Sequence, residues 1–186
     1  MIRRLAFVFV AMLFVLGPSS AQLTTGTSAP LFIAQASLGG RVFTFDLKHA
    51  LANGPVVLYF YPAAFTPGCT IEAHEFAEHI GDYRRLGATV IGVSEDDITT
   101  LQRFSVSECR SKFPVAADAD GAIAKSYDAV LTTVPKAYAN RTSYVIAPGG
   151  KIVYAYTSLD PRLHVGNTLD ALRHVRGDAL KHLRAK

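Results

Sequence analysis

The stretch PVVLYFYPAAFTPGCTIE, residues 55–72, contains a buried strand followed by the start of a helix. Residues 55–61 form a continuous run of β-branched and aromatic side chains, which is typical of a strand covered on both faces, and Pro62 ends the run. Thr66 and Pro67 suit a helix start, because a threonine hydroxyl can cap free N–H groups and proline fits the first helical position. The sequence therefore predicts a strand–helix unit, with the helix over residues 67–86.

Similar patterns flank this unit on both sides. We predict strands at 41–45, 88–93, 113–117, 142–147 and 151–157, and helices at 98–106, 122–127 and 165–183. Pro148-Gly149-Gly150 predicts a hairpin between the last two strands. Residues 22–40 are polar and rich in small side chains, so they are expected to form an arm or loop with room for a short strand. The order indicates a single α/β domain over 22–186, with parallel central strands and an antiparallel edge pair.

The first 21 residues have the layout of a secretory signal peptide. Arg3 and Arg4 are followed by an apolar run at 5–16 and by small residues that end at Ala21. An uncleaved membrane anchor is the alternative, but the run is shorter than the roughly 20 residues that a membrane span needs. We therefore expect cleavage after Ala21 and export, most simply to a bacterial periplasm, with no membrane attachment of the mature chain.

Composition and charge limit the classes of function. The chain has 186 residues, of which 49 % are hydrophobic and 18 % charged, so a single apolar core is expected. Its net charge of +4 falls to +2 once Arg3 and Arg4 are removed, which gives no support for a nucleic-acid partner. The basic residues near the C-terminus are interrupted by Asp170 and Asp178 and are interpreted as a solvated helix face. Two cysteines do not form a disulfide scaffold.

Cys69 occupies the third position of the predicted helix at 67–86. Backbone N–H groups in a first helical turn have no intrahelical partner, and the helix dipole stabilises an anion there, so a reactive thiolate is plausible on physical grounds. Gly68 leaves space beside the sulfur. However, Cys69 also lies on an apolar stripe with Ala73, Phe76 and Ile80, where a cysteine is often a small buried hydrophobic residue. The local pattern alone leaves both interpretations open.

The segment FYPAAFTPGCTIE, residues 60–72, resembles the active-site segment of the peroxiredoxins. It is most similar to the bacterioferritin-comigratory-protein type, which carries the same Thr-Pro-Gly-Cys-Thr run. The resemblance extends over essentially the whole chain after residue 21. It includes the Gly-Arg-Val-Phe strand at 40–43, the segment at 113–121 with Asp118-Ala-Asp120-Gly121, and Arg141-Thr-Ser-Tyr-Val-Ile ahead of the hairpin.

The resemblance implies a thioredoxin-like fold and the reduction of hydroperoxides without a metal or haem. Cys69 matches the peroxidatic cysteine, whose thiolate attacks the peroxide. Thr66 matches the threonine whose hydroxyl contacts the peroxide, and Pro62 the proline that shields the pocket. Arg141 matches the arginine that stabilises the thiolate and the breaking O–O bond, and Glu72 the glutamate that holds this arginine.

The second cysteine departs from the most common pattern of this type. Many members carry a resolving cysteine five positions after the peroxidatic one, where this chain has His74. Cys109 is therefore the expected resolving cysteine, forming a Cys69–Cys109 disulfide within one chain after the first helical turn unwinds. A bystander thiol with a one-cysteine mechanism and a permanent structural disulfide are the alternatives. Because Glu108 and Arg110 are polar, Cys109 is expected to be accessible, with a pKa lowered modestly by Arg110.

The sequence thus predicts an exported thiol-dependent peroxidase for hydrogen peroxide and organic hydroperoxides, reduced by a thioredoxin-like or other thiol. A thiol–disulfide exchange or redox-sensing protein on the same fold is one alternative, although Cys-x-x-Cys is absent from the sequence. A binding module with a structural disulfide is another. The pairs His74/Glu78 and Glu75/His79 lack a third metal ligand and are interpreted as solvated helix residues. A monomer or weak dimer is expected.

Overall fold

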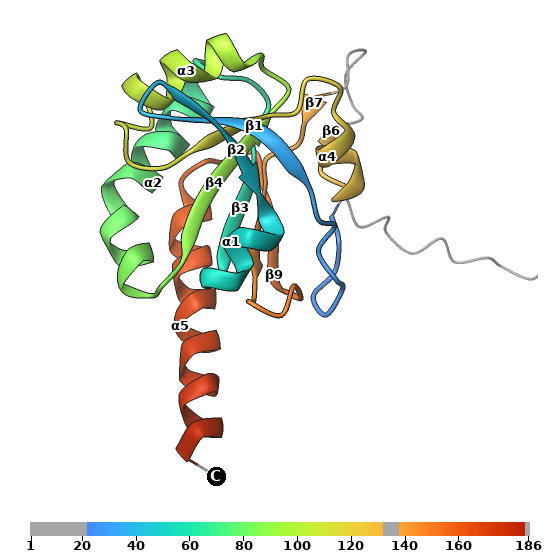
Figure 1. The fold of residues 1–186 in the computed structure, drawn as a ribbon, viewed down its shortest axis with the longest axis vertical. Coiled ribbons are helices and arrows are strands. Elements are labelled where there is room, and N and C mark those ends of the chain that lie inside the picture. The colour runs from blue at the N-terminus through green and yellow to red at the C-terminus, as the bar shows by residue number, and fades with distance from the viewer. Residues whose placement is uncertain (1–21, 132–137, 185–186) are drawn as a thin grey trace, which may run out of the picture.

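The computed structural model describes residues 22–131 and 138–184, with only the backbone described over 178–184; the predicted signal peptide lies outside the described residues. A seven-stranded mixed sheet runs through the centre of the molecule (Figure 1). Its strands, in spatial order, are β2 (Arg41–Asp46), β1 (Ile33–Leu38), β5 (Val115–Ala117), β4 (Thr89–Ser94), β3 (Val56–Phe60), β8 (Thr142–Ile146) and β9 (Ile152–Thr157). β3, β4 and β5 are parallel, and the pairs at both edges, β1–β2 and β8–β9, are antiparallel.

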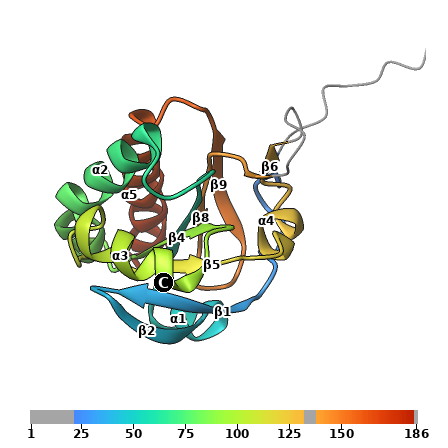
Figure 2. The same cartoon turned by 90° about the horizontal axis from the view of Figure 1, so that it is seen from above.

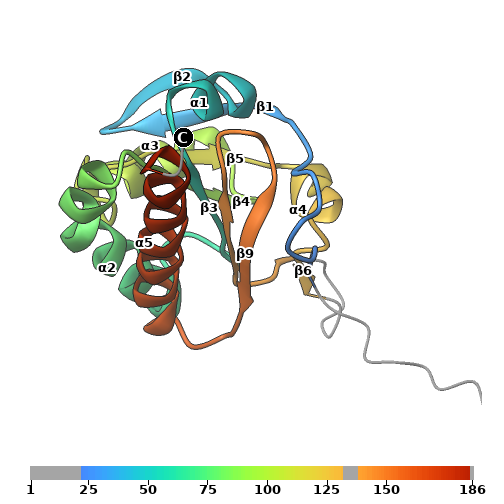
Figure 3. The ribbon, with the colours of Figure 1, turned by 90° about the horizontal axis from the view of Figure 1, so that it is seen from below.

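Helices cover both faces of the sheet. α2 (Pro67–Arg85) and α5 (Leu163–Arg184) pack against each other on one face, while α4 (Ala122–Ser126) lies on the other (Figure 2). α3 (Ile98–Ser107) packs on β1 and β5, and the short α1 (Leu47–Asn53) follows β2. A two-stranded sheet of β6 (Val130–Leu131) and β7 (Tyr138–Ala139) stands apart from the main one. The far half of α5 extends beyond the body of the domain (Figure 1), and Figure 3 shows this helix beside the sheet from below.

The central strand β3 is buried at all five positions, as the sequence predicts. Its side chains alternate between two hydrophobic cores: Val57 and Tyr59 face the α2 side, while Val56, Leu58 and Phe60 face the α4 side. Tyr59 stacks on Phe76 of α2 with ring centroids 4.4 Å apart. The same tyrosine ring lies over Gly92 on β4, where an added Cβ would be only 2.7 Å from the ring. Close packing at this point therefore fixes α2, and with it the start of that helix, against the sheet.

The predicted α/β class, the mixed sheet and the edge hairpin are confirmed, and four elements differ from the predictions. α1 was not predicted, although Asp46 caps it by accepting from the Lys48 and His49 backbone N–H groups. β1 is a full six-residue strand within the stretch expected to be mainly loop. β6 and β7 are too short to be recognised from a periodic pattern.

The segment at Asp118 leads into a turn before α4. The Asp118 carboxylate accepts from the backbone N–H groups of Ile123 and Ala124, at 2.9 and 2.8 Å. Its oxygens therefore stabilise the first turn of the helix. Separately, none of the helices in the described ranges combines the length and the apolar character that crossing a membrane requires.

Candidate active site

The first turn of α2 places Cys69 at the third helical position, as predicted. Thr66 is the N-cap with an extended backbone, Pro67 is the first helical residue, and the Thr66 carbonyl accepts from the Thr70 N–H at 2.9 Å. The prediction that the Thr66 hydroxyl caps the helix is wrong. The preceding loop folds back through Phe65, whose φ is +63°, so the hydroxyl donates instead to the Ala63 carbonyl at 2.9 Å.

A carboxylate from the next part of the chain anchors this loop. Asp96, just after β4, accepts from the Ala64 backbone N–H at 2.7 Å and from the Ser94 hydroxyl at 2.8 Å. No local pattern singles out Asp96, because one of its partners, Ala64, lies 32 residues earlier in the chain. Through this contact the loop that carries Pro62 and Thr66 is tied to the central sheet.

Cys69 fits both interpretations that the sequence left open, a buried residue of an apolar stripe and a thiol whose ionised form is stabilised. Its side chain is 1 % exposed and belongs to the core cluster that includes Ala73, Phe76 and Ile80, so it does lie on the apolar stripe. However, Arg141 Nη2 donates to the Cys69 sulfur at 3.4 Å. A hydrogen bond from a guanidinium stabilises the thiolate more than the thiol. The structure therefore places a cation against a buried sulfur at a helix N-terminus.

Arg141 is held in this position from three sides. Its side chain is 5 % exposed, and Nη1 forms a hydrogen-bonded ion pair with Glu72 Oε2. Nε donates to the Leu159 carbonyl at 3.2 Å. A Cβ added at Gly68 would lie 3.0 Å from Nη2. The absence of a side chain at Gly68 thus makes room for the guanidinium that contacts the sulfur.

Glu72 lies one helical turn after Cys69 and is fully buried. Burial raises the pKa of this carboxyl to about 8, against the opposing effect of the Arg141 charge. Its Oε1 atom has no hydrogen-bond partner among the described residues, and His164 Nδ1 lies 3.6 Å away. The site is therefore a buried cluster of a thiol, a guanidinium, a carboxyl and an imidazole.

His164 is the member of this cluster that sequence reasoning missed. It is the second residue of α5, and its ring is fully buried between α5, β8 and the loop before the helix. Burial lowers the pKa of the imidazole to about 4. One signal was available: His164 and Thr168 share the helical stripe of Leu169 and Leu172, and polar side chains on a buried stripe usually have a partner.

The expectation that Cys109 is accessible is wrong. Its side chain is fully buried in the same core cluster as Cys69, and the two cysteines are not bonded. Arg110 and Ser111 have φ angles of +50° and +56°, so the chain reverses after α3 and turns the Cys109 side chain inward. The polarity of Glu108 and Arg110 therefore does not predict whether the cysteine between them is buried.

The predicted effect of Arg110 on Cys109 is also wrong. Burial raises the pKa of the Cys109 thiol well above its ordinary value, and the Glu108 charge raises it further. Arg110 pairs instead with Glu78 at 3.1 Å, and Glu108 with His74 at 2.9 Å. These two pairs join the Cys109 segment to α2. In the described ranges no group of three or more side chains is arranged to hold a metal ion.

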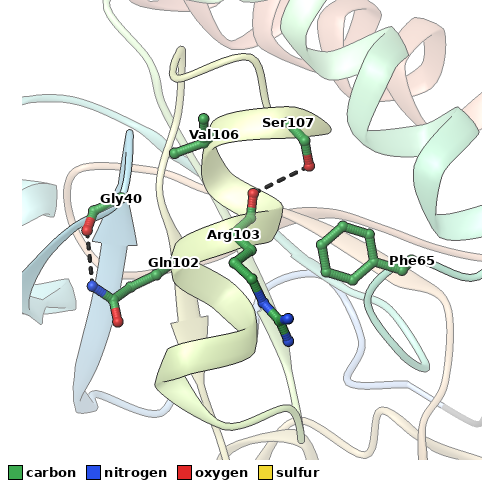
Figure 4. Close-up of a pocket in the computed structure, with 6 residues that line it drawn as sticks. All are labelled: Gly40, Phe65, Gln102, Arg103, Val106 and Ser107. Atoms are coloured by element: carbon green, nitrogen blue, oxygen red, sulfur yellow. Dashed lines mark hydrogen bonds between the residues drawn. The ribbon is translucent and has the colours of Figure 1, made fainter.

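A groove of about 720 Å³ borders the active-site loop (Figure 4). It is lined mainly by apolar surface between Phe65 and α3, and the Phe65 ring packs edge-on against Phe104 at 5.3 Å. Gln102 donates to the Gly40 carbonyl at 2.9 Å across its far side (Figure 4). The groove therefore lies next to the residue that precedes Thr66.

Comparisons with known proteins agree with this geometry. The sequence profile of the AhpC/TSA family matches residues 25–155. The chloroplastic peroxiredoxin Q of Triticum aestivum is 34 % identical over 158 residues, covering 83 % of this chain and 69 % of the relative. Peroxiredoxin Bcp of Xanthomonas campestris is 28 % identical over 145 residues, covering 70 % of this chain and 90 % of the relative.

Two solved structures are similar over most of their length. The crystal structure of peroxidoxin BcpB from Mycobacterium tuberculosis gives a TM-score of 0.73 at 29 % identity, covering 81 % of this chain and 97 % of the other. PrxQ of Xylella fastidiosa gives 0.74 at 26 % identity, covering 83 % and 98 %. These matches confirm the thioredoxin-like peroxiredoxin fold and the family that the segment at 60–72 predicted. The chain belongs to the AhpC/TSA family and is a peroxiredoxin, a thiol peroxidase.

Proposed function

We propose that Cys69 is the peroxidatic cysteine and that Arg141 activates it. The observation that carries this proposal is the 3.4 Å contact from Arg141 Nη2 to the Cys69 sulfur, at the N-terminal turn of a helix. The sulfur is nearly excluded from water, and charge interactions are stronger where the dielectric is low. A thiolate formed here faces a fixed cation that can also stabilise negative charge on a departing oxygen.

The reaction follows from these positions. The Cys69 thiolate attacks the distal oxygen of a hydroperoxide, so an S–O bond forms and the O–O bond breaks. The leaving oxygen takes the electron pair and one proton, and departs as water or an alcohol. Cys69 is left as a sulfenic acid, oxidised by two electrons. Arg141 stabilises the charge that develops on the leaving oxygen, and Glu72 keeps the guanidinium in place.

Thr66 and Pro62 serve to receive the peroxide. The Thr66 hydroxyl uses its hydrogen for the Ala63 carbonyl, so its oxygen lone pairs stay available to accept the hydrogen of a hydroperoxide. Pro62 is half-buried on the same loop, where it restricts access of water to the sulfur. Hydrogen peroxide and organic hydroperoxides share the O–OH group that this arrangement recognises.

Cys109 is proposed to resolve the sulfenic acid. Its sulfur attacks Cys69, the S–OH bond breaks, and a disulfide and water form. Both sulfurs are buried and are not bonded to each other, and we propose that the first turn of α2 and the turn after α3 open to bring them together. The left-handed backbone at Arg110 and Ser111 stores strain of about 1–3 kcal/mol per residue, which this opening relieves. A thioredoxin-like or other external dithiol then reduces the disulfide.

The setting of this activity is part of the same proposal. The charged start, the apolar run at 5–16 and the small residues before position 22 support export, with residues 22–186 as the mature domain. Export to a periplasm would place the enzyme where disulfides are stable and a dedicated reductant is needed. A monomer or weak dimer remains the proposed state.

The test uses the reduced mature chain and one equivalent of hydrogen peroxide. We expect both thiols to disappear and a Cys69–Cys109 link to be found by mass within single chains. In Cys109→Ala, peroxide is still reduced once and Cys69 accumulates as a sulfenic acid that a dimedone probe captures. If Cys109 is unmodified in the wild-type chain after Cys69 is oxidised, a one-cysteine mechanism with an external thiol replaces the resolving role. If Cys69→Ser reacts with peroxide as fast as the wild type, the assignment of Cys69 is wrong.

A further inference from the structure

The resolving step moves Cys109 out of the core, and a side chain of α2 contacts the residue before it. His74 Nε2 lies 2.9 Å from Glu108 Oε2. Since an ionised carboxylate only accepts, the imidazole N–H donates to it. The Glu108 side chain is only 17 % exposed, so much of this contact is screened from water. The contact therefore fastens the helix of Cys69 to the backbone that carries Cys109.

Two further contacts from α2 reach the same segment after α3. Arg110 Nη1 lies 3.1 Å from Glu78 Oε1. Arg84 Nη2 donates to the Lys112 carbonyl at 3.1 Å. Both Arg110 and Glu78 are exposed, and exposed ion pairs contribute little to stability. The imidazole–carboxylate contact is less exposed than this pair, so it should contribute more to holding the segment against α2.

The turn that contains the second cysteine is strained. Arg110 and Ser111 have φ angles of +50° and +56°, a conformation that persists only where the surrounding structure enforces it. The Cys109 N–H donates to the Phe104 carbonyl at 3.0 Å, and the Lys112 N–H donates to the Cys109 carbonyl at 3.0 Å. Because these bonds lie within the turn and the end of α3, the turn is held against α2 by the side-chain contacts and by burial of the sulfur.

We infer that His74 is a positioning residue for the second cysteine: by binding Glu108 it holds the strained turn closed and limits how often Cys109 leaves the core. Removing the contact changes the population of the open turn and leaves the covalent chemistry as it is. The inference deepens the proposed function, and its effect on the reaction rests on the resolving role of Cys109. A stronger contact lengthens the life of the Cys69 sulfenic acid, the species that a second peroxide oxidises further.

The first experiment measures how fast Cys109 becomes accessible. The chain has two cysteines, so Cys69→Ser leaves Cys109 as the single thiol, and because it is buried its reaction with dithiobis-nitrobenzoate requires the turn to open. We expect His74→Ala to raise the labelling rate about three- to fivefold, as the loss of a partly exposed contact predicts. His74→Gln has an amide N–H that can donate to the carboxylate as Nε2 does, and it should label within about twofold of the parent.

Two controls separate this role from a general effect on the helix. His79→Ala removes the other histidine of α2, which pairs with Asp82 of the same helix, and it should leave the labelling rate unchanged. In Glu108→Ala the partner of the imidazole is already absent, so adding His74→Ala should cause no further acceleration. Urea unfolding checks that each variant is folded under the labelling conditions.

The second experiment follows the chain with both cysteines after one equivalent of hydrogen peroxide. Rapid-quench mass spectrometry should show the Cys69–Cys109 disulfide forming about three- to fivefold faster in His74→Ala than in the parent. The formation of the Cys69 sulfenic acid should keep the parent rate. A general loosening of α2 would change both steps, and that result would contradict the role of His74.

The outcomes are distinct from those that test the proposed function. Unchanged labelling of Cys109 in His74→Ala would overturn the inference, as would equal acceleration in His79→Ala or further acceleration in the Glu108→Ala background. These results do not depend on peroxidase chemistry, because Cys69→Ser lacks the peroxidatic thiol. If labelling accelerates as expected but no disulfide forms in the chain with both cysteines, the inference holds and the resolving role of Cys109 fails.

Discussion

Replacing Gly68 by alanine should reduce activity without a matching loss of stability. The new Cβ would lie 3.0 Å from Arg141 Nη2, whereas ordinary contacts begin at 3.4 Å. Since Glu72 and the Leu159 carbonyl hold the guanidinium on its other sides, Nη2 has to move away from the sulfur that it contacts at 3.4 Å. Hydrogen bonds to charged groups contribute about 1.5–3 kcal/mol, so weakening this one by about 1–2 kcal/mol should lower the second-order rate with hydrogen peroxide by about 5- to 30-fold.

The free energy of unfolding of Gly68→Ala should stay nearly unchanged or increase slightly. Glycine inside a helix is about 0.5–1 kcal/mol less favourable than alanine, which offsets the tighter contact. Gly81→Ala is the matched control, because it lies in the same helix and its Cβ would meet Arg85 at an ordinary 3.6 Å. Stopped-flow peroxide kinetics and urea unfolding of both variants provide the test. Full activity in Gly68→Ala, or a loss of activity equal in Gly81→Ala, would refute the role assigned to this close approach.

Three further substitutions test the scaffold around the site. Asp96→Asn weakens the acceptor of the Ala64 N–H, so the peroxide rate should fall several-fold; an unchanged rate would show that the loop holds its shape unaided. Glu78→Gln breaks the exposed pair with Arg110, worth at most about 1 kcal/mol, and should speed disulfide formation by no more than about fivefold in rapid-quench mass spectrometry; slower formation would contradict the opening step. Gly92→Ala forces a Cβ to within 2.7 Å of a buried tyrosine ring and should lower the free energy of unfolding by about 1–3 kcal/mol; wild-type stability would contradict it.

The sequence predicted the fold and the members of the site for different reasons. β3 and α2 were predictable because their hydrophobic patterns and their end signals lie within the segments themselves. The buried run at 56–60 indicates the strand, and Pro67 indicates the start of the helix. Cys69, Glu72 and Arg141 were predictable through a resemblance, and not from their spacing, since 69 residues separate Glu72 from Arg141. Only the pairing of β3 with β8 brings the arginine to the helix start.

The errors share a physical cause: they concern which way one side chain points. The polarity of Glu108 and Arg110 predicted an exposed Cys109, but two consecutive residues with positive φ reverse the chain and turn the sulfur into the core. His164 had the opposite problem, because a lone histidine near a helix start carries no local sign of its partners. Those partners come from α2, β8 and the loop before α5, and they meet only in the folded domain.

Burial of Glu72 and His164 makes the stability of the fold depend on pH. Because the pKa of Glu72 is raised from 4.5 to about 8, its contribution to folding is complete below 4.5 and is lost as pH rises toward 8. The pKa of His164 is lowered from 6.5 to about 4, so its contribution is present above 6.5 and is lost as pH falls toward 4. The two slopes oppose each other between 4.5 and 6.5, and only the loss from Glu72 remains between 6.5 and 8. A well-packed apolar cluster would avoid this loss. The buried charge of Arg141 is therefore best explained by reactivity: the domain gives up stability at neutral pH to keep a cation beside the Cys69 sulfur.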